Sequence, residues 1–333
     1  MTEETPRLDF ILGLPRSGST WLGRALGGHP DVAVFGETCF YGRLYVPPRR
    51  DGLYGGEELE RVRHIQRERD WESTTTDRHA GHPPWRPGEF AALVDTAVGA
   101  LRPPVPPQDV LAAIGRAVAN RESKARAVEK TPQHVHWLPR VAASFPEARF
   151  ILTLRDPYDY MASYQRLGRR LDGRIERALD LSWRHPLIAA LFWRSYSTSI
   201  EKALASYPDR TLLVRTEDMR DRPREVLADV QSFLGLPEAD LSGEQGVNSS
   251  FRAGELRVLR GTDVLWMNLV AGRAIRRSGY GLRRQKVPVL TTTVSFLTAP
   301  LSLVATAVRV PGMTPGSFLG YLRRWHERWT AQT

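Results

Sequence analysis

Short apolar runs alternate with segments of helical periodicity along most of the chain. Apolar residues at helical spacing follow residue 18, for example, and that pattern stops at the glycine pair 27–28. Strands that alternate with helices indicate an α/β domain, with a doubly wound parallel sheet and helices on both faces. Ligands of such sheets bind at the carboxyl ends of the strands. Four runs read as buried strands: 9–13, 32–35, 149–154 and 211–214.

A further strand ends near Val128, where the chain continues as Glu-Lys-Thr-Pro. We expect Thr131 to cap one continuous helix that runs to Phe145, with Pro132 at its first position. The strand at 149–154 passes through Arg-Asp-Pro into a helix that carries Ser163. Each polar motif therefore follows the carboxyl end of a strand.

Residues 39–125 interrupt this alternation. Proline and glycine are frequent there, as in PPRRDGLYGG and PPVPP, and only 57–71 and 109–120 have a helical pattern. We expect a largely irregular insertion that shapes a substrate site; a surface loop without that role is the alternative. Its aromatic residues and arginines suit a sugar or an anionic substrate, and equally suit ordinary packing: Phe40, Tyr41, Tyr45, Trp71, Trp85, Arg43, Arg49 and Arg50.

The stretch from Val287 to Val308 contains no charged residue and follows an arginine-rich segment at 273–286. This pattern predicts contact with an anionic membrane surface through 273–333. Its threonines, serines and Pro300 weaken the case for a true span. The alternative is an apolar tail that packs on the domain or on a second subunit. We divide the chain into a domain at 1–282 and a basic, apolar extension at 283–333.

The formal net charge of +10 and the isoelectric point near 10.1 predict attraction to anions. We find no basic stripe interleaved with aromatic residues and expect no nucleic-acid partner. The single cysteine, Cys39, excludes an internal disulfide and favours a reducing compartment; we interpret it as a small buried thiol. The first ten residues lack an apolar core, so we expect no signal peptide and a cytoplasmic protein.

The stretch FILGLPRSGSTWL has the glycine spacing of a phosphate-binding loop, but Ser19 stands where a nucleotide triphosphatase has lysine. The N–H groups at the start of the following helix suit a phosphate or a sulfate. The hydroxyls of Ser17, Ser19 and Thr20 can add donors, and Arg16 can bind an oxyanion without a metal. A simple turn that begins a helix is the alternative.

With this loop, the later segments EKTP, LRDPYDYMASY, LLVRTEDM, FLGLP and RRSGYG make the chain resemble the sulfotransferases that use 3′-phosphoadenosine 5′-phosphosulfate (PAPS). The resemblance extends from about Asp9 to Tyr280. It implies a core like that of P-loop nucleotide triphosphatases, PAPS as co-substrate and no metal. It also implies a set of PAPS-binding residues: Arg16, Ser17, Gly18, Ser19, Thr20 and Trp21 around the 5′-phosphosulfate, with Arg155 and Ser163 at the 3′-phosphate.

The resemblance further implies that Glu37 is the general base, as in the carbohydrate and protein-tyrosine branches. Lys130 and Arg16 would then stabilise charge on the leaving oxygen. Alternatively, Glu37 caps a turn or pairs with an arginine, and Lys130 pairs with its neighbour. His134 and His136 are reserve candidates for the base, although at least one of them is expected to be structural.

Two segments limit the resemblance. Thr216 replaces a tyrosine that relatives often carry, which puts an aromatic contact on the adenine side in doubt. Residues 248–252 would lie in the loop that closes over the nucleotide.

The sequence therefore predicts transfer of a sulfuryl group to the hydroxyl of a carbohydrate, a glycolipid or another amphiphilic alcohol. A P-loop kinase or nucleotide triphosphatase is the first alternative, and Ser19 argues against it. A non-catalytic protein that binds nucleotides or membranes on the same fold is the second. The oligomeric state stays open.

Overall fold

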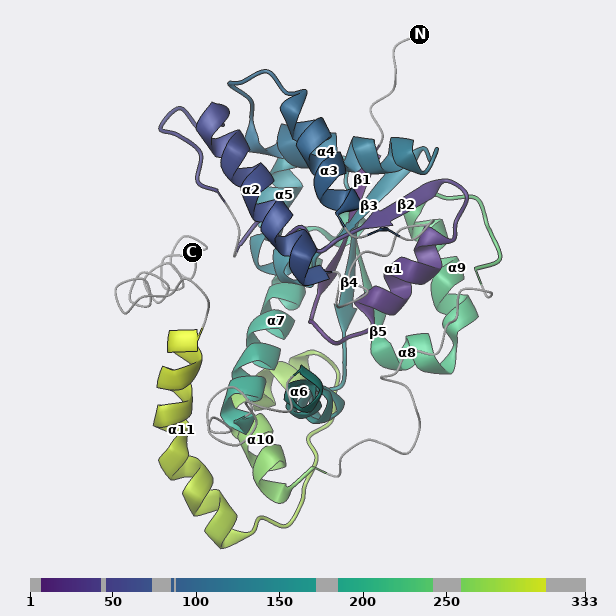
Figure 1. Ribbon diagram of the computed structural model, residues 1–333. Coiled ribbons are helices and arrows are strands. Elements are labelled where there is room, and N and C mark those ends of the chain that lie inside the picture. The colour runs from purple at the N-terminus through teal and green to yellow at the C-terminus, as the bar shows by residue number, and fades with distance from the viewer. Residues whose placement is uncertain are drawn as a thin grey trace. The chain divides into compact units, whose positions relative to one another are not determined.

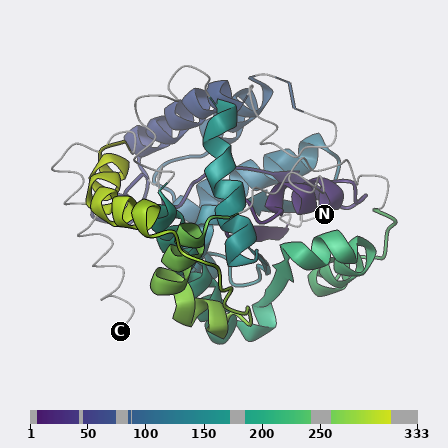
Figure 2. The same ribbon diagram turned by 90° about the horizontal axis from the view of Figure 1, so that it is seen from below.

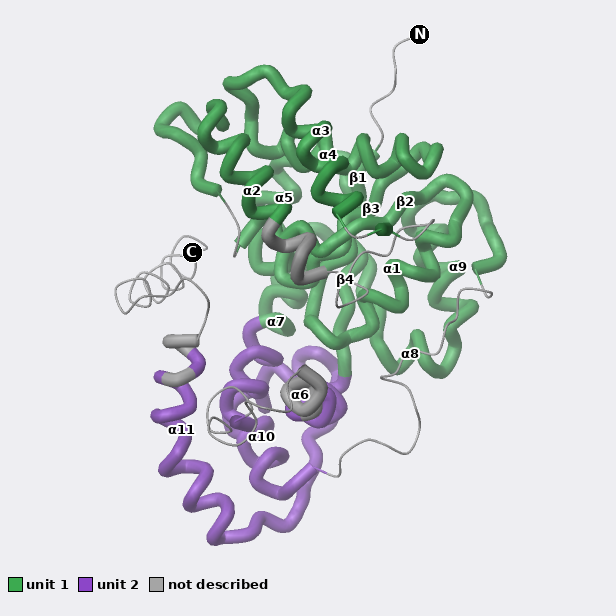
Figure 3. Tube along the Cα trace, in the orientation of Figure 1, with its two compact units in different colours: residues 1–155, 196–252 green, residues 156–195, 253–333 purple. Residues whose placement is uncertain are grey.

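The computed structural model describes residues 7–42, 46–73, 85–86, 88–171, 185–241 and 259–309. The chain forms two compact units, shown in different colours in Figure 3. Unit 1 comprises residues 1–155 and 196–252, and unit 2 comprises residues 156–195 and 253–333. The boundary expected between residues 282 and 283 lies inside unit 2 and stays a prediction.

Unit 1 contains a five-stranded sheet in which every pairing is parallel (Figure 1). The order of strands is β2-β3-β1-β4-β5, so the winding reverses at β1. The predicted α/β class with a parallel sheet is confirmed. All five strands end at the same edge of the sheet, where α/β folds bind their ligands. The strands are β1 (Arg7–Gly13), β2 (Val32–Phe35), β3 (Arg126–Lys130), β4 (Phe150–Leu154) and β5 (Thr211–Arg215).

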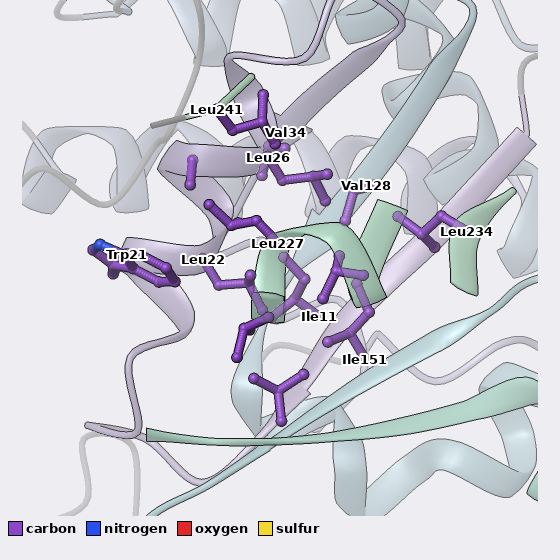
Figure 4. Close-up of a cluster of buried hydrophobic side chains, with 14 of the residues drawn as sticks. Ile11, Trp21, Leu22, Leu26, Val34, Val128, Ile151, Leu227, Leu234 and Leu241 are labelled. Atoms are coloured by element: carbon purple, nitrogen blue, oxygen red, sulfur yellow. The ribbon is translucent and has the colours of Figure 1, made fainter. Parts of the chain in front are cut away.

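Helices cover both faces of this sheet. On one face, α1 (Ser19–Gly27) and α9 (Pro223–Leu234) bury their apolar residues against Ile11, Val128 and Ile151 (Figure 4). On the other face lies α4 (Pro107–Arg121), where a Cβ on Gly115 would come within 3.1 Å of Leu8. Leu8 and Ile11 stand three positions apart in one strand, so their side chains point to opposite faces. The short helix α8 (Thr216–Asp221) connects β5 to α9.

The insertion at 39–125 is more regular than the sequence analysis predicted. It contains α2 (Gly56–Ser73) and α3 (Glu89–Gly99) in addition to α4. The unexpected helix is α3, which buries Phe90, Val94 and Val98 at spacings of four residues. We did not predict this helix because the sequence directly before it is rich in proline, which is typical of a loop.

One continuous helix between Thr131 and Phe145 was also expected, and this was wrong. The chain forms a 3₁₀ helix, η1 (Pro132–Trp137), followed by α5 (Leu138–Ser144). Pro139 has no N–H group to bond back into the preceding turn, which accounts for the break. Thr131 is the residue before the helix as expected, but its side chain makes no capping bond. Its hydroxyl donates to the Glu129 carboxylate instead.

Unit 2 is helical in its described part. It contains α6 (Pro157–Leu171), the first half of α7 (Pro186–Ser206), α10 (Gly261–Arg277) and α11 (Val289–Arg309). Helix α10 ends at the RRSGYG motif as expected, and α11 lies beside it in both views (Figure 1 and Figure 2). In the described part of the chain, no helix combines the length and apolarity needed to cross a membrane. The expected nucleotide-closing loop at 248–252 lies outside the described residues.

Candidate active site

The candidate residues of unit 1 follow one another along the carboxyl edge of the sheet. The strand order places Glu37 after β2, Lys130 at the end of β3, the glycine-rich loop after β1 and Arg155 after β4. Neighbouring parallel strands lie about 4.8 Å apart. The loop therefore emerges between the strand that ends in Lys130 and the strand that is followed by Arg155.

The loop after β1 is held tightly against β4. The Leu14 N–H donates to the Thr153 carbonyl at 2.8 Å, and the Ser17 hydroxyl lies 2.6 Å from the Thr153 hydroxyl. Ser17 also donates to the Leu14 carbonyl and is fully buried. A Cβ at Gly13 would stand 2.3 Å from the Thr153 carbonyl oxygen, so only glycine permits this approach. The Ser17 side chain thus shapes the loop.

Two further side chains hold the outer part of the loop. The Arg155 guanidinium donates to the Arg16 carbonyl at 3.2 Å. The Thr216 hydroxyl lies 2.8 Å from the Ser17 carbonyl and 3.1 Å from the Leu154 carbonyl. Arg16 itself has the left-handed backbone conformation, with φ 69°, and its side chain is exposed. The loop conformation is therefore fixed from the ends of β4 and β5.

Helix α1 begins directly at the end of this loop. Gly18 precedes it with φ 87°, no side chain of the described residues caps this helix end, and the first turn contains no acidic residue. The first N–H groups and the positive end of the helix dipole therefore remain available to an anion. Ser19 is buried, Thr20 is half-buried, and Trp21 packs into the core cluster that Figure 4 shows. This end of α1 can hold a phosphate or a sulfate.

Glu37 and Lys130 form an ion pair beside the loop. The Lys130 ammonium lies 3.1 Å from Glu37 Oε1; the lysine side chain is fully buried and the glutamate side chain is 22% exposed. Gly36 makes the approach possible, because a Cβ there would lie 2.1 Å from the Lys130 carbonyl oxygen. A pair between Glu37 and a lysine was not among the expected alternatives. Two of the three candidate catalytic side chains are therefore in direct contact.

The chain after Glu37 is held by an unusual set of side-chain acceptors. The Thr38 N–H and hydroxyl reach Glu129 Oε1 at 3.4 and 2.8 Å, and the Tyr41 N–H donates to His134 Nε2 at 3.0 Å. In between, the Cys39 N–H donates to the Thr131 hydroxyl at 3.3 Å. Four successive N–H groups, those of residues 38 to 41, therefore bond to side chains, since the Phe40 N–H donates to the Thr38 hydroxyl. We call Glu129, Thr131 and His134 the clamp.

Glu129 is the centre of the clamp and is completely buried. His134 Nε2 accepts the Tyr41 N–H, so Nδ1 carries the ring proton and faces Glu129 Oε2 at 3.1 Å. Burial alone raises the pKa of the Glu129 carboxyl, but His134 and the hydroxyls of Thr131 and Thr38 outweigh it, so the pKa lies below its usual value. Glu129 and Lys130 are consecutive strand residues and point to opposite faces. The clamp therefore holds the backbone that carries Glu37 from the side opposite the ion pair.

The two histidines of η1 have different surroundings. His134 is buried in the clamp and is structural in this position. His136 is half-buried, with Nδ1 2.9 Å from the Ser199 hydroxyl and its ring centre 4.3 Å from that of Tyr196. Cys39 is a buried thiol, as expected, and Phe40 and Tyr41 are packed in the interior.

Ser163, the remaining candidate, belongs to unit 2. It is buried on α6. Asp156 precedes that helix and accepts the N–H groups of Tyr158 and Asp159 at 2.9 and 3.0 Å. These bonds fix the start of α6 within its own unit.

Thr153 and Glu129 were not predicted as site residues, and Thr216 was predicted only to lack an aromatic contact with adenine. The signal for Thr153 is a hydroxyl inside an otherwise apolar buried strand, FILTL. The signal for Glu129 is a carboxylate directly after the two apolar strand residues Ala127 and Val128. Both residues place a polar group in a core, which costs free energy unless it is hydrogen-bonded.

Known proteins resemble this chain over most of its length. The model of the sulfotransferase family matches residues 10–240. A "Putative protein-tyrosine sulfotransferase" of Caenorhabditis briggsae is 23% identical over 239 residues, which are 71% of this chain and 68% of that protein.

Two solved structures share the fold. The sulfotransferase domain from the curacin biosynthetic pathway has a TM-score of 0.50 at 19% identity, over 84% of this chain and 100% of that one. The sulfotransferase STF9 from Mycobacterium avium has a TM-score of 0.50 at 15% identity, over 85% of this chain and 79% of that one.

Proposed function

Because the chain belongs to the sulfotransferase family, we propose that it transfers the sulfuryl group of PAPS to an acceptor hydroxyl, with Glu37 as general base. The observation that carries this proposal is the Glu37–Lys130 pair, at 3.1 Å, after β2 and at the end of β3, on one side of the loop that follows β1. The pair brings together a proton acceptor and a buried positive charge at one edge of the sheet. An in-line displacement at sulfur needs both groups.

The residues around the loop fit a phosphosulfate. The start of α1 has no side-chain cap and no acidic residue in its first turn, and Arg16 stands exposed in the loop. A phosphosulfate carries the charge that such a helix end favours. We propose that the backbone from Ser17 to Trp21, the side chains of Ser19 and Thr20, and Arg16 hold the 5′ end of PAPS. Bound PAPS supplies the sulfuryl group, and adenosine 3′,5′-bisphosphate leaves.

The proposal gives the proton transfer and the stabilisation of charge to different side chains. Glu37 takes the proton from the acceptor hydroxyl, and the clamp keeps its backbone in place. Lys130 and Arg16 stabilise negative charge on the leaving oxygen. Lys130 is buried next to Glu37, so its charge acts where water is scarce and electrostatic interactions are stronger than in bulk water.

We assign the 3′-phosphate to Arg155 and Ser163, by resemblance to the family. Arg155 already donates to the Arg16 carbonyl, so it supports the loop as well as any ligand. The hydroxyl of Thr216 is bonded to the loop and to β4. Thr216 therefore serves the loop, and its small side chain offers adenine no aromatic surface.

The acceptor is proposed to be a carbohydrate, a glycolipid or another amphiphilic alcohol. The long insertion and the apolar tail support this class. The proposed location is the cytoplasm, with peripheral contact at the inner face of a membrane.

The test is a transfer assay with radiolabelled PAPS against carbohydrate, lipid and phenolic extracts. The wild type is expected to label one of them. Glu37→Gln should lower the rate by about 100- to 10,000-fold, as expected when a general base is lost. A Glu37→Gln variant that transfers sulfate at the wild-type rate would remove Glu37 as the base. A wild type that binds PAPS and labels none of the extracts would favour the non-catalytic alternative.

A further inference from the structure

Helix α11 of unit 2 is amphipathic, but its polar face is turned inward and its apolar face outward. Its inward face consists of small and hydroxyl residues: Thr292, Ser295, Ala299 and Ser302 are half-buried or buried. Five large aliphatic side chains lie on the opposite face. We call these residues the outer stripe: Leu290, Val294, Leu297, Leu301 and Val304, which are between 52% and 78% exposed.

The orientation of α11 is fixed by specific contacts with its neighbours in unit 2. The Thr292 hydroxyl lies 2.9 Å from the Thr262 hydroxyl, and Trp266 Nε1 donates to the Ser295 hydroxyl at 2.8 Å. His185 Nε2 lies 2.9 Å from the Ser295 carbonyl, and Phe296 stacks on Trp266 with ring centres 4.4 Å apart. If burial of apolar surface alone set the orientation, the leucines would lie on the inward face. Here hydrogen bonds hold the polar face inward and leave the outer stripe outside.

The surroundings of the stripe are strongly basic. Residues 264–309, which include α11 and most of α10, contain seven arginines and lysines and no aspartate or glutamate. Arg284 and Lys286 are exposed just before α11, and Arg283 reaches back to Asp156 and Asp159. A second copy of the chain would bring the same positive charge to the stripe, which opposes a symmetric contact. An anionic lipid surface offers negative headgroups and an apolar interior next to each other.

We propose that α11 lies in the plane of an anionic membrane, with the outer stripe inserted among the acyl chains and the basic residues at the headgroups. Contacts to unit 2 along Thr292, Ser295 and Phe296 keep the helix parallel to the protein surface. This membrane contact does not depend on the reaction proposed at the edge of the sheet. Membrane binding can therefore be measured without knowledge of the acceptor.

The test is flotation of the full chain with phosphatidylcholine vesicles, with and without phosphatidylglycerol. The wild type should float only with the anionic vesicles, and less at high salt, because the Debye length shrinks to about 3 Å at 1 M. The double variant Leu297→Asp/Leu301→Asp should bind at least about tenfold more weakly. Leu269→Asp is the matched control, because Leu269 on α10 is 61% exposed, like Leu301. It should bind like the wild type.

An environment-sensitive dye on Leu297→Cys identifies the occupant of the stripe; Cys39 is buried, which directs the label to position 297. The emission should shift to the blue only when anionic vesicles are added. An emission that is already blue in buffer would mean that the chain itself or a second copy covers the stripe, and sedimentation equilibrium separates these two cases. Either result overturns the proposal, as does equal binding by the double variant.

Discussion

The ammonium of Lys130 lies 3.1 Å from a carboxylate oxygen of Glu37, and the lysine side chain is fully buried. A buried charge is tolerated only when a partner compensates for it. The pair therefore has a structural consequence as well as its proposed chemical one, and variants can separate the two.

Glu37→Gln removes the carboxylate that faces Lys130. We expect the free energy of unfolding to fall by about 1–3 kcal/mol, less than for a fully buried pair because Glu37 is 22% exposed. The double variant Glu37→Gln/Lys130→Met should recover most of this stability and none of the activity. Chemical denaturation and the transfer assay measure the two effects. A double variant as unstable as the single one would show that the ion pair is not the cause.

Lys130→Met should lower kcat by about 100- to 1,000-fold, because a buried positive group near the leaving oxygen would be lost. The control is Lys124→Met. Lys124 precedes the same strand at its opposite end, where its ammonium donates to the carbonyls of Gly27 and Val32. We expect that variant to lose stability and keep its turnover per folded molecule. Equal kinetic losses in both variants would contradict the role given to Lys130.

Thr216→Val removes the hydroxyl that reaches the Ser17 and Leu154 carbonyls. The affinity for adenosine 3′,5′-bisphosphate should fall by about tenfold, because the loop loses its link to β5. Thr211→Val is the matched control: Thr211 lies at the other end of β5 and donates to the Tyr207 carbonyl at 2.7 Å. Both variants should cost stability, and only Thr216→Val should weaken binding in calorimetry. If Thr211→Val bound the bisphosphate more weakly than Thr216→Val, Thr216 would be excluded as a support of the loop.

Two buried carboxyls should affect the pH dependence of stability with opposite signs. The pKa of Glu129 is lowered in the fold, so its contribution is present above the unfolded value of 4.5 and is lost as pH falls through the folded value. Burial raises the pKa of Asp9 above 3.8, against the opposing effects of the Arg149 N–H, Arg7 and Arg126. The contribution of Asp9 is therefore present below 3.8 and is lost as pH rises through its folded value.

Glu129→Gln should accordingly remove part of the loss of stability in acid, and Asp9→Asn should make that loss steeper. The free energy of unfolding, measured between pH 3 and pH 7, reports both changes. Variants that change the slope in the same direction would show that one of the two assignments is wrong.

The sheet and the order of motifs along it were predictable from the sequence, because buried parallel strands are nearly continuous apolar runs. The loop at 13–18 was predictable for the same reason, since glycine spacing and a following helix are local signals. The break at Pro139 also has a local signal, the proline itself, although we expected one continuous helix there.

The clamp could not be predicted in this way. Glu129, Thr131 and His134 meet residues 38–41 across about ninety positions of sequence, and hydrogen bonds between distant segments leave no periodic pattern. The orientation of α11 was hidden for a related reason. The sequence of an uncharged segment does not indicate which face of the helix is buried. Here the buried face is set by hydroxyls of α11 whose hydrogen-bond partners lie on α10.

The most direct measurement of the central claim is calorimetry of the full chain with adenosine 3′,5′-bisphosphate and, separately, with ATP and magnesium. The loop has Ser19 in place of the lysine that contacts a triphosphate, and the start of α1 fits a phosphosulfate. We predict tight binding of the bisphosphate and much weaker binding of ATP. Tight binding of ATP with magnesium, without binding of the bisphosphate, would contradict the proposed function.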